Sequence, residues 1–457
     1  MKEQNIKRLN DSFAMRWGAL VIVAFTMMAS YYVNDVTAPL KTMLQTDLGW
    51  TSSDFGVFTG AYSFLNVFLL MLIWGGLILD RFGIRFTGKL ATILMVAGTG
   101  IEYYAMTYMS GSADLGIILG YRSDVFIASA GYSIFGVGAE VAGITATKMV
   151  AKWFRGKELA TAMGVQVALA RVGSQGAYAL SIPLAKAYGI TSPVFVGLIC
   201  LFGGLIAFFS FSILDKKFDR QIEDELKAEG ASDEEKFSFK DVKLILCNPG
   251  FWLIALLCVL FYSCVFPFQK YASELMISKY GISEDLAGLI AGLPAMGALF
   301  LTPVFGGLID RIGKSASIMM FGSAMLIGVH AIYSLPFINS GVVAIALMIV
   351  LGIAFSLVPS AMWPAVAKIF PAKQLGTAYA LIFFIQNIGL WGVPTLIGVV
   401  LDKFCVTGVE NGTVLYDYTL PMCIFTGFAI LSLTVAFALK VADRKFCYHL
   451  EEANIKK

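Results

Sequence analysis

The stretch VAKWFRGKELATA at residues 150–162 returns as VAKIFPAKQLGTA at residues 366–378. The two copies share the pattern V-A-K-x-F-x-x-K-x-L-x-T-A at an offset of 216 residues in a chain of 457. Each copy is a short polar segment between two long apolar runs. A motif that repeats at nearly half the chain length predicts two similar structural halves.

The apolar runs on either side of this motif indicate a membrane protein. The chain is 58% hydrophobic and 14% charged, with a mean hydropathy of +0.76, whereas soluble globular proteins carry about 25% charged residues. Apolar runs of about 18 residues or more predict membrane-spanning helices. Such runs lie at 17–40, 55–79, 86–109, 123–149, 159–184, 190–214, 250–271, 285–309, 315–335, 341–367, 375–401 and 418–440. We therefore expect an all-α membrane protein with twelve transmembrane helices in two pseudo-symmetric six-helix bundles.

The basic residues predict the orientation of these helices. Most of the 34 Lys and Arg fall in segments that share one side of the membrane with both chain termini. Those expected on the other side or at its helix ends are Lys41, Arg122, Lys186, Lys270, Lys279 and Lys403, and Arg171 alone lies deep within a run. Loops rich in Lys and Arg stay in the cytoplasm. Both termini are therefore expected to be cytoplasmic, with the basic residues flanking the lipid bilayer rather than binding nucleic acid.

The same pattern predicts the domain organisation. We expect a cytoplasmic N-terminus at 1–16, bundles at 17–214 and 248–440, a charged cytoplasmic linker at 215–247 and a cytoplasmic tail at 441–457. The linker mixes acidic and basic residues, as solvated and partly helical segments do. The first 16 residues show no cleavable signal pattern.

A second motif also repeats and carries a family resemblance. GGLILDRFGIR (75–85) recurs as GGLIDRIGK (306–314), at the end of the second helix of each half. The pattern resembles the loop signature of the major facilitator superfamily, and parallel repeats occur in that transporter architecture. The resemblance implies a gate latch, in which glycines let helix ends approach closely. The matching residues are Gly76, Asp80, Arg81, Gly83 and Arg85 in the first half and Asp310, Arg311, Gly313 and Lys314 in the second.

Longer stretches narrow this resemblance. GVGAEVAG (136–143), KWFRGKELATAMGVQVALARVGS (152–174), FWLIALLCVLFYSCVFPF (251–268) and MWPAVAKIFPAKQLGTAYALIFFIQNIGL (362–390) are similar to the lysosomal dipeptide uniporter family of that superfamily. The resemblance implies a facilitator that moves dipeptides by alternating access. Many proton-coupled members of the superfamily carry Arg early in helix four, where this chain has Tyr132. That departure also favours a facilitator.

Two charged residues in adjacent predicted helices are the leading site candidates. At about 1.5 Å per residue, Arg171 lies roughly 18 Å and Glu140 roughly 14 Å from the cytoplasmic helix ends. Both are therefore near the middle of a hydrocarbon core about 30 Å thick, where a charge is costly and normally functional. A dipeptide is a zwitterion, so Glu140 would take its ammonium group and Arg171 its carboxylate. The resemblance implies the same roles, and the empty carrier could let the two side chains neutralise each other.

A buried salt bridge that only holds two helices together is the structural alternative for this pair. At the repeat offset, Glu140 corresponds to Ser356 and Arg171 to Asn387, so the second half keeps the motif without these charges. Because the second half lacks the charges, the architecture does not require them, and a buried ion pair is weak evidence for stability. The repeat therefore favours the substrate-binding role.

Other polar or aromatic residues at similar depth could join the site or could simply pack between helices. These further candidates are Tyr62, Asn66, Gln166, Tyr262, Phe266, Gln269, Trp363, Gln386, Asn387 and Asp35. Asp35 lies toward the outer end of the first helix. It is either a second anion, favouring dipeptides with cationic side chains, or an interfacial carboxylate.

Enzyme and cofactor signatures are missing from the sequence. No phosphate-binding glycine loop is present, and the seven Cys have no metal-ligand spacing, so we expect no catalytic residues, cofactor or metal. The expected partners are a dipeptide or similar small zwitterion and the lipid bilayer. We expect a monomer, with an accessory subunit left open.

The leading interpretation is a dipeptide facilitator. The alternatives are a proton-coupled organic-anion carrier, with the proton on Glu140, and a receptor or scaffold that does not transport. The short N-terminus and compact loops favour a bacterial inner membrane, and a lysosomal membrane would be expected in a eukaryotic host.

Overall fold

The computed structural model describes residues 9–110, 116–154, 157–229, 239–371, 374–410 and 413–453, and these are helical almost throughout. The first half contains α1 (Phe13–Asp35), α2 (Lys41–Leu48), α3 (Ser52–Phe68), α4 (Met71–Tyr104), α5 (Ser123–Trp153), α6 (Leu159–Tyr188) and α7 (Ser192–Glu229), with the short elements η1 (Leu9–Asp11), η2 (Ala38–Leu40), η3 (Ala105–Met109), β1 (Ile117–Ile118) and β2 (Tyr121–Arg122). The second half contains α8 (Phe239–Leu246), α9 (Pro249–Tyr280), α10 (Glu284–Ala291), α11 (Leu293–Ile312), α12 (Ser315–Ser334), α13 (Gly341–Ile369), α14 (Leu375–Phe404), β3 (Val406–Glu410), β4 (Thr413–Tyr416) and α15 (Thr419–Phe446).

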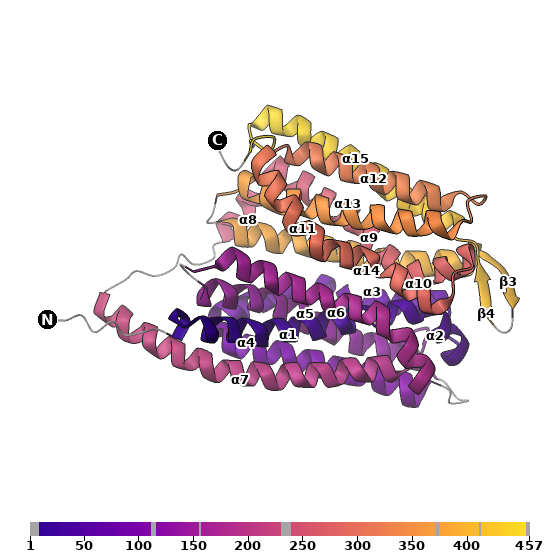
Figure 1. Cartoon of the computed structure of the whole chain (residues 1–457), viewed down its shortest axis with the longest axis horizontal. Helices are drawn as coiled ribbons and strands as arrows, with labels where there is room; N and C mark the ends of the chain where they lie inside the picture. Colours follow the sequence, from indigo (N-terminus) through magenta and orange to yellow (C-terminus); the bar gives the residue numbers. More distant parts are fainter. Residues whose placement is uncertain are drawn as a thin grey trace.

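The two halves are separate helical bundles that lie side by side (Figure 1). Within the first, α4 packs on α5 and α1 on α6; within the second, α12 packs on α15 and α11 on α13. The start of α1 and the end of α15 lie at one end of the molecule, here called the terminal end (Figure 1). The antiparallel β3–β4 hairpin projects from the opposite end, here called the hairpin end.

Ten helical segments of the described residues are long and apolar enough to cross a membrane. The predicted spans at 55–79 and 159–184 are not among them. The first of these is divided between α3 and α4, because Leu70 turns the chain with φ 53° between the two helices. The structure thus establishes a multi-helix membrane fold, and the count of twelve spans stays a prediction.

Local sequence explains where several helices begin and end. The Thr51 hydroxyl accepts a hydrogen bond from the Asp54 N–H, and the Asp54 carboxylate accepts one from the Thr51 N–H. This capping box satisfies two backbone donors at the start of α3. Gly83 has φ 75° and ψ 176°, a backbone conformation that glycine adopts without steric cost. It turns the chain inside α4, within the first copy of the loop motif.

The halves meet closely toward the hairpin end, where α3 packs on α14. A Cβ atom added to Gly56 would lie 2.6 Å from the Pro394 carbonyl oxygen, and one added to Gly60 would lie 2.5 Å from the Trp391 carbonyl oxygen. Only glycine permits this backbone approach. On the other side of the molecule α6 packs against α10 and α11, also toward the hairpin end.

The segment predicted as a linker is helical on both sides of residues 230–238, which lie outside the described residues. α7 continues to Glu229 and α8 begins at Phe239. The connection between the last two long helices contains the β3–β4 hairpin, with Val409 opposite Val414 and a bulge between Val406 and Gly408.

Candidate functional site

The Glu140 carboxylate on α5 accepts a hydrogen bond from a neighbouring helix. The Tyr62 hydroxyl on α3 donates to Glu140 Oε1 at 3.1 Å. The ring of Tyr62 packs against Tyr132 and Phe135 of α5, with ring centroids 5.7 and 6.1 Å apart. Tyr62, a sequence-predicted candidate, therefore lies beside Glu140 and orients its carboxylate.

The Arg171 guanidinium on α6 contacts aromatic rings. Its Cζ lies 5.5 Å from the ring centroid of Tyr31 on α1 and 4.9 Å from that of Phe355 on α13. Among the described residues it has no hydrogen-bond acceptor and no carboxylate within ion-pair distance. Sequence reasoning missed both rings, because an aromatic residue in an apolar helix has no pattern that separates a functional contact from packing.

Glu140 and Arg171 do not form an ion pair in this conformation, within the part of the chain that the structure describes. The expectation that they neutralise each other therefore does not hold here. Arg171 contacts Tyr31 on α1, and α1 packs on both α5 and α6, so the two charges lie on helices of the first half that share a neighbour. A carboxyl group and a guanidinium without ionic partners among the described residues could bind the opposite charges of a zwitterion.

The predicted aromatic residues of the second half form one connected cluster. Tyr262 and Phe266 on α9 stack at 5.2 Å, and Phe355 packs edge-to-face on Phe266 at 5.4 Å. The indole N–H of Trp363 on α13 donates to the Tyr262 hydroxyl at 3.3 Å. Because Phe355 also contacts Arg171, this cluster reaches the charged region of the first half.

The predicted amide side chains have no contact with the two charges. Gln386 accepts a hydrogen bond from the Cys258 thiol, and the Asn387 amide donates to the Phe383 carbonyl of its own helix. Asn66 is buried, and within the described residues neither its amide oxygen nor its amide nitrogen has a partner. Gln166 and Gln269 are buried as well. These residues lie in the helices of the site without joining the Glu140 and Arg171 contacts.

Asp35 is engaged elsewhere. The Lys270 ammonium on α9 lies 2.9 Å from Asp35 Oδ1 and also donates to the Asn34 carbonyl. Asp35 thus joins the two halves as one partner of an ion pair. Its charge is balanced by Lys270 in this conformation, and its role toward a cationic side chain of the substrate stays a prediction.

A second ion pair between the halves was not predicted. The Lys41 ammonium lies 2.5 Å from Glu274 Oε2 and donates to the Ser52 hydroxyl at 2.7 Å. The Tyr418 hydroxyl donates to the same Glu274 oxygen. Lys41 and Glu274 are both buried. A lysine and a glutamate within apolar helices, each needing a counter-ion, could have indicated this pair.

The first copy of the loop motif is held within its own half. The Asp80 carboxylate accepts a hydrogen bond from Lys148 of α5 at 2.7 Å, and Arg85 pairs with Asp219 of α7 at 2.8 Å. Arg81 lies over the ring of Phe82. Gly76 has open space where a Cβ would stand, so the expected close helix approach does not occur at this glycine.

The second copy packs against the C-terminal segment. A Cβ on Gly313 would lie 2.4 Å from the Glu452 carbonyl carbon, so this glycine lets the C-terminal segment, rather than a helix end, approach closely. Lys314 precedes α12 with φ 60°, and its N–H donates to the Glu451 carbonyl. Asp310 and Arg311 occupy the last turn of α11.

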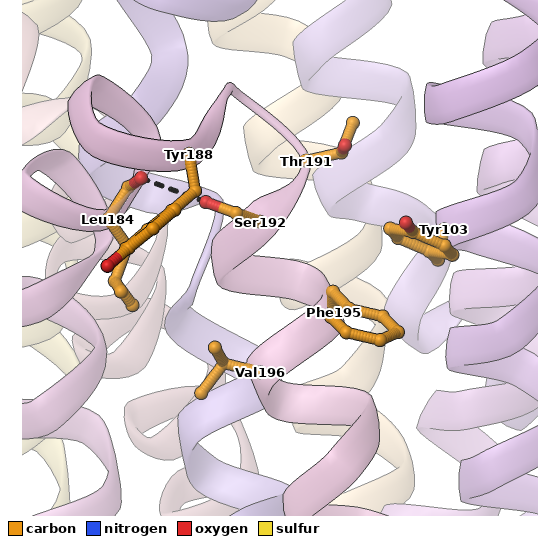
Figure 2. Close-up of a pocket in the computed structure, with 7 residues that line it drawn as sticks. All are labelled: Tyr103, Leu184, Tyr188, Thr191, Ser192, Phe195 and Val196. Carbon is orange, nitrogen blue, oxygen red and sulfur yellow. Dashed lines mark hydrogen bonds between the residues drawn. The ribbon is translucent and has the colours of Figure 1, made fainter.

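The cavity shown in Figure 2 lies away from these charges. It measures about 350 Å³ and is enclosed by the hairpin-end parts of α4, α6 and α7. Tyr103 and Phe195 pack together across it, and the Ser192 hydroxyl donates to the Leu184 carbonyl (Figure 2). It contains no predicted site residue, so we place the candidate site at Glu140 and Arg171. Among the described residues, no group of three His, Cys, Asp or Glu side chains could hold a metal ion.

Comparison with known proteins agrees with this architecture. The family model described as Major Facilitator Superfamily matches residues 20–393. The human lysosomal dipeptide transporter MFSD1 is 28% identical over 404 residues, covering 85% of this chain and 81% of that protein. The chain is also similar in fold to a mutant of the nucleoside transporter NupG, with a TM-score of 0.71, 11% identity and coverage of 92% and 99%.

A D-xylose–proton symporter gives a TM-score of 0.69 at 14% identity, with 93% of this chain and 97% of that chain covered. These structures share the fold, and the matched family consists of transporters rather than enzymes. The family match spans most of the chain, which contains many apolar helices. The chain belongs to the major facilitator superfamily and is a multi-pass integral membrane transporter.

Proposed function

We propose that this transporter is a facilitator for dipeptides. The observation that carries the proposal is that Glu140 on α5 and Arg171 on α6, two helices that both pack on α1 in the first half, have no ionic partners among the described residues. Unbalanced charges at membrane depth are costly and mark substrate pathways. A substrate with one cation and one anion would balance both at once.

The presence of a carboxyl group as well as a guanidinium, not paired with each other, favours a zwitterion over a simple anion. A carrier for organic anions needs Arg171, but a fixed carboxylate nearby would repel its substrate unless that carboxylate carries a proton. A dipeptide uses both groups: its ammonium binds Glu140 and its carboxylate accepts a forked pair of hydrogen bonds from Arg171. The similarity to a lysosomal dipeptide transporter supports the same substrate class.

The connections between the halves support alternating access. The ion pairs Lys41–Glu274 and Lys270–Asp35 and the close α3–α14 packing gather toward the hairpin end. If the termini are cytoplasmic, as the basic residues predict, this conformation is closed on the outer side. The substrate would then leave toward the cytoplasm or enter from it.

Uptake into proteoliposomes tests the proposal. A labelled dipeptide, its free amino acids and a dicarboxylate are compared with and without a pH gradient, for the unchanged protein and for Arg171→Ala and Glu140→Gln. We expect dipeptide uptake that needs no gradient and that falls at least a hundredfold in both variants. Lys89→Ala, whose side chain lies over the ring of Phe209 outside the loop motif, controls for general damage to the first half.

Two results would overturn the proposal. Gradient-dependent dicarboxylate uptake without dipeptide flux would favour the proton-coupled anion carrier, with the proton on Glu140. Uptake of none of these solutes by well-folded protein would instead favour the receptor or scaffold.

A further inference from the structure

The Arg171 guanidinium lies beside two aromatic rings that belong to different halves. Tyr31 comes from α1 of the first half and Phe355 from α13 of the second, at 5.5 and 4.9 Å from Cζ. Both distances are within the range of cation–π attraction. The rings, here called the aromatic clamp, attract the cation without cancelling its charge.

A clamp of this kind leaves the hydrogen-bond donors of Arg171 available. A carboxylate partner would accept hydrogen bonds from the guanidinium N–H groups, whereas a ring face attracts the cation through its π electrons. Among the described residues these N–H groups have no acceptor. A substrate carboxylate can therefore bind without first displacing a competing carboxylate of the protein.

Phe355 is held firmly by its own half. Its side chain is 3% exposed, and it packs edge-to-face on Phe266 at 5.4 Å and on Tyr262 at 6.5 Å. Tyr262 is fixed in turn by the hydrogen bond from Trp363. The ring that faces Arg171 is therefore anchored, and it can hold the guanidinium in one place while the halves are in this arrangement.

We propose that Tyr31 and Phe355 are positioning residues that keep Arg171 unpaired and oriented as the receptor for the substrate's carboxylate. The carrier would therefore select solutes with a free C-terminal carboxylate over their amides, and Phe355 would set much of that selectivity. This inference rests on the proposed dipeptide function. It goes beyond it by assigning the selectivity to rings that contact Arg171.

The test measures transport of one dipeptide and of its C-terminal amide by the full-length protein in proteoliposomes. The variants are Phe355→Leu, Phe355→Tyr and Tyr31→Leu, with Phe383→Leu as the matched control. Phe383 belongs to the second half and stacks on Trp363, and it has no contact with Arg171. For the free acid, Phe355→Leu should raise KM about tenfold with little change in kcat, as expected for loss of a desolvated cation–π contact.

For the amide, which has no carboxylate for Arg171 to bind, Phe355→Leu should leave KM unchanged. Phe355→Tyr should restore the KM of the free acid because it keeps the ring. Tyr31→Leu should raise the KM of the free acid as Phe355→Leu does, so it provides an independent test if Phe355→Leu folds poorly.

Equal KM changes for acid and amide, a change confined to kcat, or the same effect from Phe383→Leu would each overturn the inference and assign Phe355 to packing. These failures are distinct from failure of the proposed function. If the proposed function itself were wrong, Arg171→Ala would leave dipeptide uptake intact, or the unchanged protein would not transport dipeptides.

Discussion

Among the described residues, the Glu140 carboxylate accepts one side-chain hydrogen bond, which the Tyr62 hydroxyl donates. A hydrogen bond to a charged group contributes about 1.5–3 kcal/mol, so its loss should be measurable. Tyr62→Phe removes only that hydroxyl. We expect KM for a free dipeptide to rise at least about tenfold, while KM for the N-acetyl dipeptide, which has no ammonium group, stays the same.

Tyr132→Phe is the matched control for this change. Its hydroxyl donates to the Asn34 carbonyl at 2.7 Å and makes no hydrogen bond to Glu140. Transport assays with both substrates measure the difference. If Tyr62→Phe raised KM equally for both substrates, or if Tyr132→Phe raised KM for the free dipeptide by the same factor, Tyr62 would have no specific role at the ammonium site.

At the residue scale, sequence reasoning singled out the two charges and Tyr62 beside Glu140, but not the two rings beside Arg171. Glu140 and Arg171 stand out because a charge is rare in an apolar run. Tyr31 and Phe355 do not, because this chain contains 36 Phe and 18 Tyr and most pack between helices. One signal was available: Phe355 directly precedes Ser356, the position that corresponds to Glu140 in the repeat.

The helices α3 and α14 form the closest contact between the halves, and glycine makes it possible. A Cβ on Gly56 would stand 2.6 Å from a backbone oxygen of α14. Gly56→Ala should therefore disfavour the conformation that is closed at the hairpin end, shifting the equilibrium about tenfold or more, since overpacking costs about 1–3 kcal/mol. Gly76→Ala is the control, because its Cβ would meet open space.

Spin-label distances measure this shift. Labels at Thr46 and Val409, in a background without the seven native cysteines, report the separation of the halves at the hairpin end, since Thr46 lies on α2 and Val409 on β3. Gly56→Ala should populate a longer distance and Gly76→Ala should not. An unchanged distance distribution in Gly56→Ala would contradict the assigned role of this contact.

A second element-scale contact, at the start of α6, makes a pH-dependent contribution to stability. The Arg16 side chain donates to Glu158 at 2.8 and 3.1 Å, and this hydrogen bonding lowers the pKa of Glu158 below its ordinary value. The contribution is therefore present above the ordinary glutamate pKa and is lost as pH falls through the lowered one.

Glu158→Gln should slightly lower the thermal midpoint in detergent at neutral pH, and this difference should vanish in acid. The difference in thermal midpoint between the variant and the unchanged protein is measured by thermal unfolding at pH values from 7 to 3. A difference that grew as the pH fell would contradict the sign.

Among the contacts that join the halves at the hairpin end, two lie at repeat-related positions. Lys186 at the end of α6 lies at the repeat offset from Asp402 near the end of α14. The Asp402 carboxylate accepts from the backbone N–H of Ser52 and of Ser53 at the start of α3, whereas Lys186 pairs with Asp285 at the start of α10. Each half thus reaches the other with a charged residue at the same repeat position, a lysine in the first half and an aspartate in the second.

These two contacts should differ in strength. Lys186 is exposed, and screened surface pairs contribute little, while Asp402 caps two backbone donors at a helix start and also accepts from the Tyr416 hydroxyl. Asp402→Ala should shift the Thr46–Val409 distance markedly, and Lys186→Gln only slightly and only at low salt. Equal shifts at high salt would contradict this difference.

At this scale the repeat predicted much and missed one feature. Two matching motifs in long apolar runs predicted two helical bundles, because a chain inside the bilayer has few ways other than a helix to hydrogen-bond its backbone N–H and C=O groups. The same offset of 216 residues, applied to Lys186, leads to Asp402 and would have indicated a charged residue at the equivalent place in the second half. The division of one predicted span between α3 and α4 had no signal, since Leu70 with φ 53° is a conformation that leucine rarely adopts.

The most direct measurement of the central claim is dipeptide binding with each terminus blocked in turn. The free dipeptide, its N-acetyl form and its C-terminal amide are titrated against the unchanged protein, Glu140→Gln and Arg171→Ala. The account predicts that acetylation weakens binding to the unchanged protein and to Arg171→Ala but not to Glu140→Gln, and that amidation weakens binding to all but Arg171→Ala. Equal sensitivity of both variants to both blocked forms would contradict the assignment of the two charges to the two ends of a dipeptide.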